Sequence, residues 1–94
     1  MDFLARRGQN FQERFDFKSA DNKPIAIPAG ELKIFLTHGT YAKEYSLGNG
    51  LNKQRATVFW TIPAAEVDSF AYNTMYYTLV LNDLELARGV LRVQ

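Results

Sequence analysis

Apolar and polar side chains alternate with a period of two along most of this sequence. In the segment FQERFDFKS, Phe11, Phe15 and Phe17 share one face, and polar or charged side chains share the other. Successive side chains of a strand point to opposite faces of its sheet, so this pattern is typical of a half-buried antiparallel strand. Further strand-like segments follow at residues 24–27, 32–36, 43–47, 58–62, 76–81 and 84–93. The alternation therefore predicts an all-β fold of about seven short antiparallel strands in a two-sheet sandwich.

Turn-forming residues separate these segments. ADNKP at residues 20–24 and the pair Asn82-Asp83 are typical of tight turns. GNG at residues 48–50 supplies glycines for positions with a positive φ, and we expect the following LNKQ, residues 51–54, to be a polar loop. The order of strands and turns fits a chain of 94 residues that folds as one domain.

One segment interrupts the β pattern. WTIPAAEVDSF begins like a buried strand, breaks at Pro63 and continues with helical spacing of its apolar residues. Proline suits the first turn of a helix, so we expect a short helical crossover near residues 63–70 that carries the chain between the two sheets of a Greek key. The alternative is an isolated amphipathic helix in an α+β fold. The apolar positions expected to face the core are Ala64, Val67 and Phe70.

Composition and charge exclude several classes of function. Eleven basic and ten acidic residues nearly cancel, so we expect neither a nucleic acid nor a membrane as partner. The absence of cysteine rules out disulfides, thiolate metal sites and a cysteine nucleophile. The N-terminal sequence lacks the apolar run of a signal peptide, and we expect synthesis in the cytoplasm.

Residues that carry chemistry are sparse. His38 is the only histidine, so a histidine metal cluster is ruled out, and its place at a strand end is typical of a surface or turn residue. The carboxylates are scattered along the chain. We therefore expect no enzyme activity, no catalytic residues, no metal and no cofactor.

Tyrosines allow two interpretations. Tyr41, Tyr45, Tyr72 and Tyr76 are candidates for an aromatic platform that binds sugars, or they pack in the core and in cross-strand pairs. The candidates for a phenol that hydrogen-bonds back to the helical crossover are Tyr72, Tyr76 and Tyr77.

Two stretches of the sequence resemble the small Ig-like β-sandwich modules of tailed-bacteriophage virions. The first is LARRGQNFQERFDFKSADNKPIAI, and the second is ATVFWTIPAAEVDSF with the later YYTLVLNDLELARGVLRV. These include the N-terminal domain of upper baseplate proteins and related tail or head accessory proteins. Gln9 and Met75 depart from the family, which often has aspartate and an aromatic residue there. The matching residues are Arg7, Gly8 and Phe11; Asp21, Lys23 and Pro24; Ile62, Pro63 and Ala64; and Gly89, Leu91 and Val93.

The resemblance implies an Ig-like Greek-key sandwich that serves as a multi-copy structural protein of the virion, in the baseplate, the tail or the capsid surface. Its implied partners are other virion structural proteins and copies of itself, in a symmetric array. The alternative is an Ig-like module that binds a carbohydrate or protein on the host surface.

Residues 1–10 precede the first long strand, and we expect them to form an arm, with residues 11–94 as the sandwich domain. The arm would order on a neighbouring subunit, and its deletion would leave the fold intact. The alternative is a frayed terminus or a strand paired within its own sheet. The partner-binding candidates on the arm are Phe3, Leu4, Arg6 and Arg7.

Overall fold

The alternating segments form the strands of one curved sheet in the computed structural model, which describes residues 2–94. One helix, α1 (Ala64–Ser69), links the sixth strand to the seventh. The strands are β1 (Phe3–Ala5), β2 (Phe11–Asp16), β3 (Leu32–His38), β4 (Tyr41–Leu47), β5 (Gly50–Gln54), β6 (Thr57–Ile62), β7 (Thr74–Leu81) and β8 (Leu84–Val93). The predicted all-β class is confirmed.

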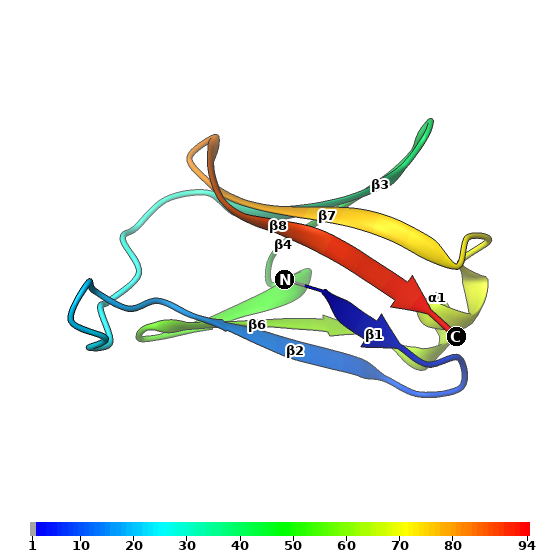
Figure 1. Cartoon of the computed structure of the whole chain (residues 1–94), viewed down its shortest axis with the longest axis horizontal. Coiled ribbons are helices and arrows are strands. Elements are labelled where there is room, and N and C mark those ends of the chain that lie inside the picture. Colours follow the sequence, from blue (N-terminus) through cyan, green and yellow to red (C-terminus); the bar gives the residue numbers. More distant parts are fainter. Residues whose placement is uncertain (1) are drawn as a thin grey trace.

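The strands follow the order β1-β8-β7-β3-β4-β5-β6-β2 across the sheet. The sheet curls until its two edge strands, β1 and β2, lie on the same side of the molecule, which makes a nearly closed barrel (Figure 1). β2 pairs with β6, and β7 pairs with both β3 and β8, all antiparallel. These antiparallel pairs agree with the predicted all-β class.

The strands differ from the expected seven antiparallel ones in number and direction. Residues 2–94 form eight strands, and two of the pairs among them are parallel: β1 with β8, and β4 with β5. The second pair forms because Gly48 and Gly50 both have a positive φ and turn the chain so tightly that β5 starts beside the end of β4. The LNKQ segment is therefore part of a strand and not a loop. This short ladder joins the two layers into one mixed sheet.

Residues 24–27 do not form the expected edge strand. Pro24 makes an isolated bridge with Lys18, and the chain then continues without regular structure along the neighbouring segments. The N–H of Ile25 donates to the carbonyl of Phe17, and that of Ile27 donates to the carbonyl of Arg55. Because proline has no N–H, the pairing cannot extend regularly through Pro24.

Trp60 lies at the centre of the core, and its side chain is fully buried. Aromatic rings surround it, with ring centroids at 5.1 Å for Phe11, 5.6 Å for Tyr45 and Tyr77, and 6.4 Å for Phe3. Most of these pairs meet edge to face, the arrangement that the charge distribution of aromatic rings favours. Within residues 2–94 no nitrogen or oxygen accepts a hydrogen bond from the indole N–H.

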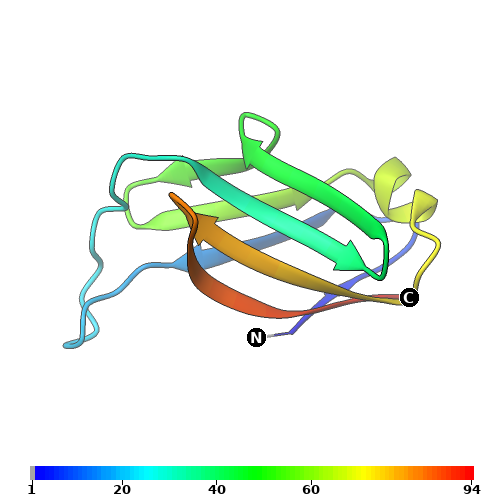
Figure 2. The same ribbon diagram turned by 90° about the horizontal axis from the view of Figure 1, so that it is seen from above.

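Helix α1 closes one end of the barrel, and the long connection between β2 and β3 lies at the opposite end (Figures 1 and 2). Pro63 is the residue before the first helical turn, in an extended conformation. Val67 and Phe70 are buried as expected, whereas Asp68 and Ser69 are exposed. The predicted crossover near residues 63–70 is confirmed, and its apolar side covers the end of the core.

The N-terminal residues belong to the barrel and not to a free arm. Residues 3–5 form β1, which pairs with Leu91–Val93 of β8, and Phe3 and Ala5 are buried. The Phe3 ring stacks on Tyr77 at 5.3 Å and meets the edge of Phe15 at 5.5 Å. The division at residue 10 is therefore wrong, because Phe3 fills core volume between the two layers. The structure agrees with the alternative of a strand paired within its own sheet.

Candidate functional site

The connection between β1 and β2 forms hydrogen bonds with both ends of helix α1. The Nη1 atom of Arg7 donates to the carbonyl oxygens of Val67, Asp68 and Phe70 at 3.2, 3.3 and 2.9 Å. The last carbonyls of a helix have no partner within the helix, and a guanidinium satisfies them while opposing the negative end of the helix dipole. Arg7 therefore caps the C-terminal end of α1 from a distant part of the sequence.

Two further contacts complete this unit, which we call the helix clamp and define as Arg7, Gly8 and Asn10 with α1. The Gly8 N–H donates to Oδ1 of Asp68 at 2.6 Å. At the other end of the helix, the N–H of Ala64 donates to Oδ1 of Asn10 at 2.8 Å. Pro63 offers no side-chain oxygen, so Asn10 supplies the acceptor that a helix N-terminus requires.

The four residues expected to bind a partner have three different environments. Phe3 is buried in the core, whereas Arg7 is exposed and hydrogen-bonded to the carbonyls at the end of α1. Leu4 is 38% exposed because it points away from the core between Phe3 and Ala5. Arg6 is exposed as well. Of the predicted set, Phe3 is in the core, and Leu4, Arg6 and Arg7 are on the surface.

A polar cluster lies beside α1 at the junction of β4 and β5. Glu66 accepts a hydrogen bond from the hydroxyl of Tyr45 at 3.1 Å on one oxygen, and Nζ of Lys43 lies 3.1 Å from the other. Burial raises the pKa of Tyr45 far above its ordinary value, and the negative charge of Glu66 adds to the effect. These residues line a shallow hollow of about 320 Å³ together with Asn49, Gly50, Thr61 and Pro63. The Tyr45 phenol thus bonds to the crossover, and Tyr45 was not among the three expected candidates.

Part of the expected aromatic platform forms at the same end of the barrel. The rings of His38 and Tyr72 stack at 3.9 Å, and the ring of Tyr41 meets Tyr72 at 6.0 Å. Nδ1 of His38 lies 2.9 Å from the carbonyl oxygen of Thr74, which fixes the imidazole at the strand end. Tyr45 is in the core and Tyr76 is on the outer face of the sheet, so only Tyr41 and Tyr72 of the four come together.

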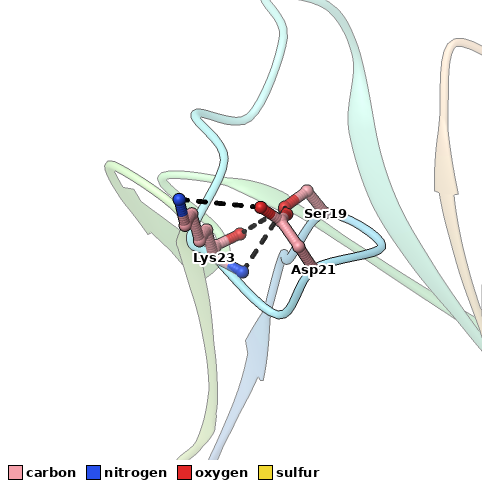
Figure 3. Close-up of polar contacts among 3 residues, drawn as sticks. All are labelled: Ser19, Asp21 and Lys23. Atoms are coloured by element: carbon pink, nitrogen blue, oxygen red, sulfur yellow. Dashed lines mark hydrogen bonds and ion pairs between the residues drawn. The ribbon is translucent and has the colours of Figure 1, made fainter.

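The opposite end carries a tight turn at Ser19, Asp21 and Lys23 (Figure 3). The hydroxyl of Ser19 donates to a carboxylate oxygen of Asp21, and Nζ of Lys23 lies 3.7 Å from the other. The Ser19 hydrogen bond is the main cause that lowers the pKa of Asp21. The turn expected at ADNKP is confirmed. Its exposed polar side chains stabilise the turn itself and do not converge on a cavity.

The sequence analysis missed the exposed apolar residues. Alternation along a strand shows which face a side chain is on, but not whether another part of the protein covers that face. Phe35 and Tyr76 lie on the outer face of β3 and β7, with 37% and 54% of their surface exposed. Two others, Ile25 and Leu86, line an apolar pocket between β2 and β8. The exposed large apolar side chains are Leu4, Ile25, Phe35, Leu47, Tyr76, Leu84 and Leu86.

Among residues 2–94 no three histidine, aspartate or glutamate side chains converge to hold a metal ion. No helix in that range has the length and apolar character that crossing a membrane requires. No model of a known protein family matches this chain, and no curated protein matches it either.

Proposed function

We propose that this chain is a non-enzymatic structural protein of a bacteriophage virion. It acts as a multi-copy assembly module of the baseplate, the tail or the capsid surface, and it attaches or clamps neighbouring virion proteins. Its partners are other virion structural proteins and further copies of itself. It is made in the host cytoplasm and ends in the particle.

The observation that carries this proposal is the helix clamp. Arg7 and Gly8 belong to one stretch of the phage-module resemblance, and Pro63 and Ala64 belong to the other. The clamp brings the two stretches together, because Arg7 caps the end of the helix that Pro63 begins. Residues that match the phage modules at two distant places in the sequence thus contact each other in the fold. This supports an architecture shared with those modules and, through the resemblance, a shared role.

Purified particles test the proposal. Mass spectrometry of particles banded from the lysate of producing cells should detect the protein at a fixed ratio to the main capsid protein. A low, symmetry-related copy number would place it in the tail or baseplate, and a count on the order of hundreds would place it on the capsid surface. Its presence only in the soluble lysate would refute the structural role.

An Ig-like module that binds a carbohydrate or protein on the host surface is the second candidate. The stacked rings of His38 and Tyr72, with Tyr41 beside them, are the observation that favours it, because sugars pack on aromatic faces. Binding of the isolated monomer to a glycan array, lost in Tyr72→Ala and kept in Tyr76→Ala, would support this alternative. Equal binding by both variants would exclude the aromatic cluster as the site.

A further inference from the structure

The barrel remains open along a seam between its two edge strands, β1 and β2. β1 has only three residues and covers the outer edge of β8 at Leu91–Val93. Within residues 2–94 no strand pairs with that edge of β8 over Leu84–Ala87, or with the outer edge of β2. The seam therefore has sheet edges on both sides, and such edges are templates for the addition of another strand.

An apolar pocket of about 280 Å³ lies in this seam. Phe15 and Leu79 come from the core, whereas Ile25 and Leu86 form a rim and are 44% and 38% exposed. Leu86 is the extra residue of a β-bulge, since Leu79 pairs with Ala87 and Val80 with Glu85. The pocket is lined by Phe15, Asp16, Phe17, Lys18, Ile25, Leu79, Leu86 and Ala87.

The pocket lies along the seam beyond Phe3, the first residue of β1. The ring of Phe3 packs on Phe15 at 5.5 Å, and Phe15 also lines the pocket, so the two positions are neighbours along the seam. Just before Phe3, the N–H of Val90 donates to the Asp2 carboxylate at 3.2 Å. Alternate side chains of a strand lie roughly 7 Å apart on one face, so a strand placed further along would direct a side chain into the pocket.

We propose that the seam between β2 and β8 is a docking groove for an extended segment of a neighbouring protein in the assembly. The segment adds to the edge of β8, continues the β1–β8 ladder, and inserts one aliphatic side chain between Phe15 and Ala87. This inference rests on the proposed role as an assembly module and names the surface by which the module holds its neighbour.

Three features determine the occupant. The open strand edges require an extended backbone that offers N–H and C=O groups in register. The pocket is apolar and its two polar contributors, Asp16 and Lys18, carry opposite charges, so it selects an aliphatic side chain and not a charged one. The added strand would continue the β1–β8 ladder, so it would extend a sheet that is already formed.

The test uses a blocked peptide in which valine alternates with threonine between terminal lysines, titrated into the isotope-labelled full chain. We expect amide shifts concentrated at Phe15–Lys18 and Leu86–Ala87. Ala87→Leu fills the pocket from within and should weaken binding about tenfold or more. Leu84→Ala is the control, because Leu84 is on the same strand but outside the pocket, and its binding should stay within about twofold.

Several outcomes would refute the proposal that this seam is a docking groove. Shifts confined to the Phe35 and Tyr76 face, or binding that Ala87→Leu leaves unchanged, would place the contact elsewhere. Shifts that depend on protein concentration without the peptide would identify a second copy as the occupant. Should Ala87→Leu lose cooperative melting, Ile25→Ser at the exposed rim replaces it, with the same expected weakening.

Incorporation into particles separates this inference from the proposed function. If wild-type protein is present in particles and Ala87→Leu is incorporated equally, the groove is refuted and the structural role stands. If wild-type protein is absent from particles but the peptide binds with the expected sensitivity to Ala87→Leu, the groove stands and the virion role falls.

Discussion

Nη1 of Arg7 lies 2.9 Å from the carbonyl oxygen of Phe70, although 63 residues separate the two in the sequence. This contact joins the start of the chain to the segment that crosses between the layers of the barrel. The same nitrogen also reaches the carbonyls of Val67 and Asp68, so one side chain contacts three carbonyls at the end of a six-residue helix. A helix this short is marginal by itself, and tertiary contacts of this kind determine whether it forms.

Arg7→Ala should lower the free energy of unfolding by about 1–3 kcal/mol, because it removes charge-assisted hydrogen bonds from carbonyls that are partly shielded from water. Urea unfolding followed by far-ultraviolet circular dichroism measures the change. Arg6→Ala is the matched control and should stay within about 0.5 kcal/mol, since Arg6 is exposed and, unlike Arg7, donates no side-chain hydrogen bond within residues 2–94. Equal losses in both variants would show that Arg7 acts only through general charge.

Asn10→Ala should cost about 1 kcal/mol, the usual loss when the N-terminus of a helix loses its side-chain acceptor. Asn10→Asp should retain the acceptor and gain from the positive end of the helix dipole. Hydrogen exchange at the Ala64 amide reports the contact directly, and Gln9→Ala, next to it and exposed, serves as the control. Unchanged exchange at Ala64 in Asn10→Ala would contradict the capping role.

Phe3→Ala should destabilise the protein by about 3–5 kcal/mol, because the ring fills core volume between Phe15 and Tyr77. Leu4→Ala should cost far less, within roughly 1 kcal/mol, since its side chain points outward. Thermal melts of the two variants make the comparison. A small loss for Phe3→Ala would restore the hypothesis of a dispensable N-terminal arm.

Stability should fall as the pH rises above about 10, where the tyrosines of the unfolded chain ionise. Burial raises the pKa of Tyr45, and also those of Tyr41 and Tyr77, so in this range unfolding releases protons that the folded protein retains. Below that range the full contribution of the neutral phenols is present. Urea midpoints measured between about pH 8 and 11.5 should show this decline.

Tyr45→Phe should make the alkaline decline shallower, and at neutral pH it should cost about 1 kcal/mol for the lost hydrogen bond to Glu66. Glu66→Gln is the control, because it keeps an acceptor for the phenol and removes only the charge, which is a smaller cause of the shift than burial. The decline should therefore persist in Glu66→Gln. A decline that disappears there would show that charge and not burial dominates.

Gly50→Ala should be more destabilising than Gly48→Ala. Both glycines have a positive φ, at +95° and +82°, which costs an alanine about 1–2 kcal/mol. Only at Gly50 would the new Cβ lie 2.6 Å from Cδ1 of Tyr45, a buried ring that cannot move aside, whereas Gly48 has open space around it. The difference between the two melting temperatures isolates this clash, and equal temperatures would argue against it.

Segments with long alternation were predictable from the sequence. Residues 11–17 and 58–62 contain enough alternating residues for a period of two to be recognised, and Pro63 marks the start of the helix. The alternation of Ala87, Gly89, Leu91 and Val93 also agrees with the inward face of β8. Local spacing determines these elements, so a local pattern reveals them.

The remaining features depend on partners that are distant in the sequence. β1 has three residues, too few to show a period, and only pairing with β8 distinguishes buried Phe3 from exposed Leu4. The helix clamp requires Arg7 and Phe70 to meet in space, and a single sequence carries no signal of that contact. The seam pocket likewise forms where side chains of β2, β7 and β8, such as Phe15, Leu79 and Leu86, meet in space.

The parallel arrangement of β1 and β8 has a mechanical consequence. Tension applied between Asp2 and Gln94 would pull the two strands in opposite directions along their common axis, so the load falls on them as shear. The ladder from Phe3 to Ala5, the bond from Gln94 N–H to the Ala5 carbonyl at 2.9 Å, and that from Arg7 N–H to the Gln94 carbonyl at 2.7 Å would resist together and not break one after another. A domain linked through its ends would withstand stretching along the ladder in which its first and last strands pair.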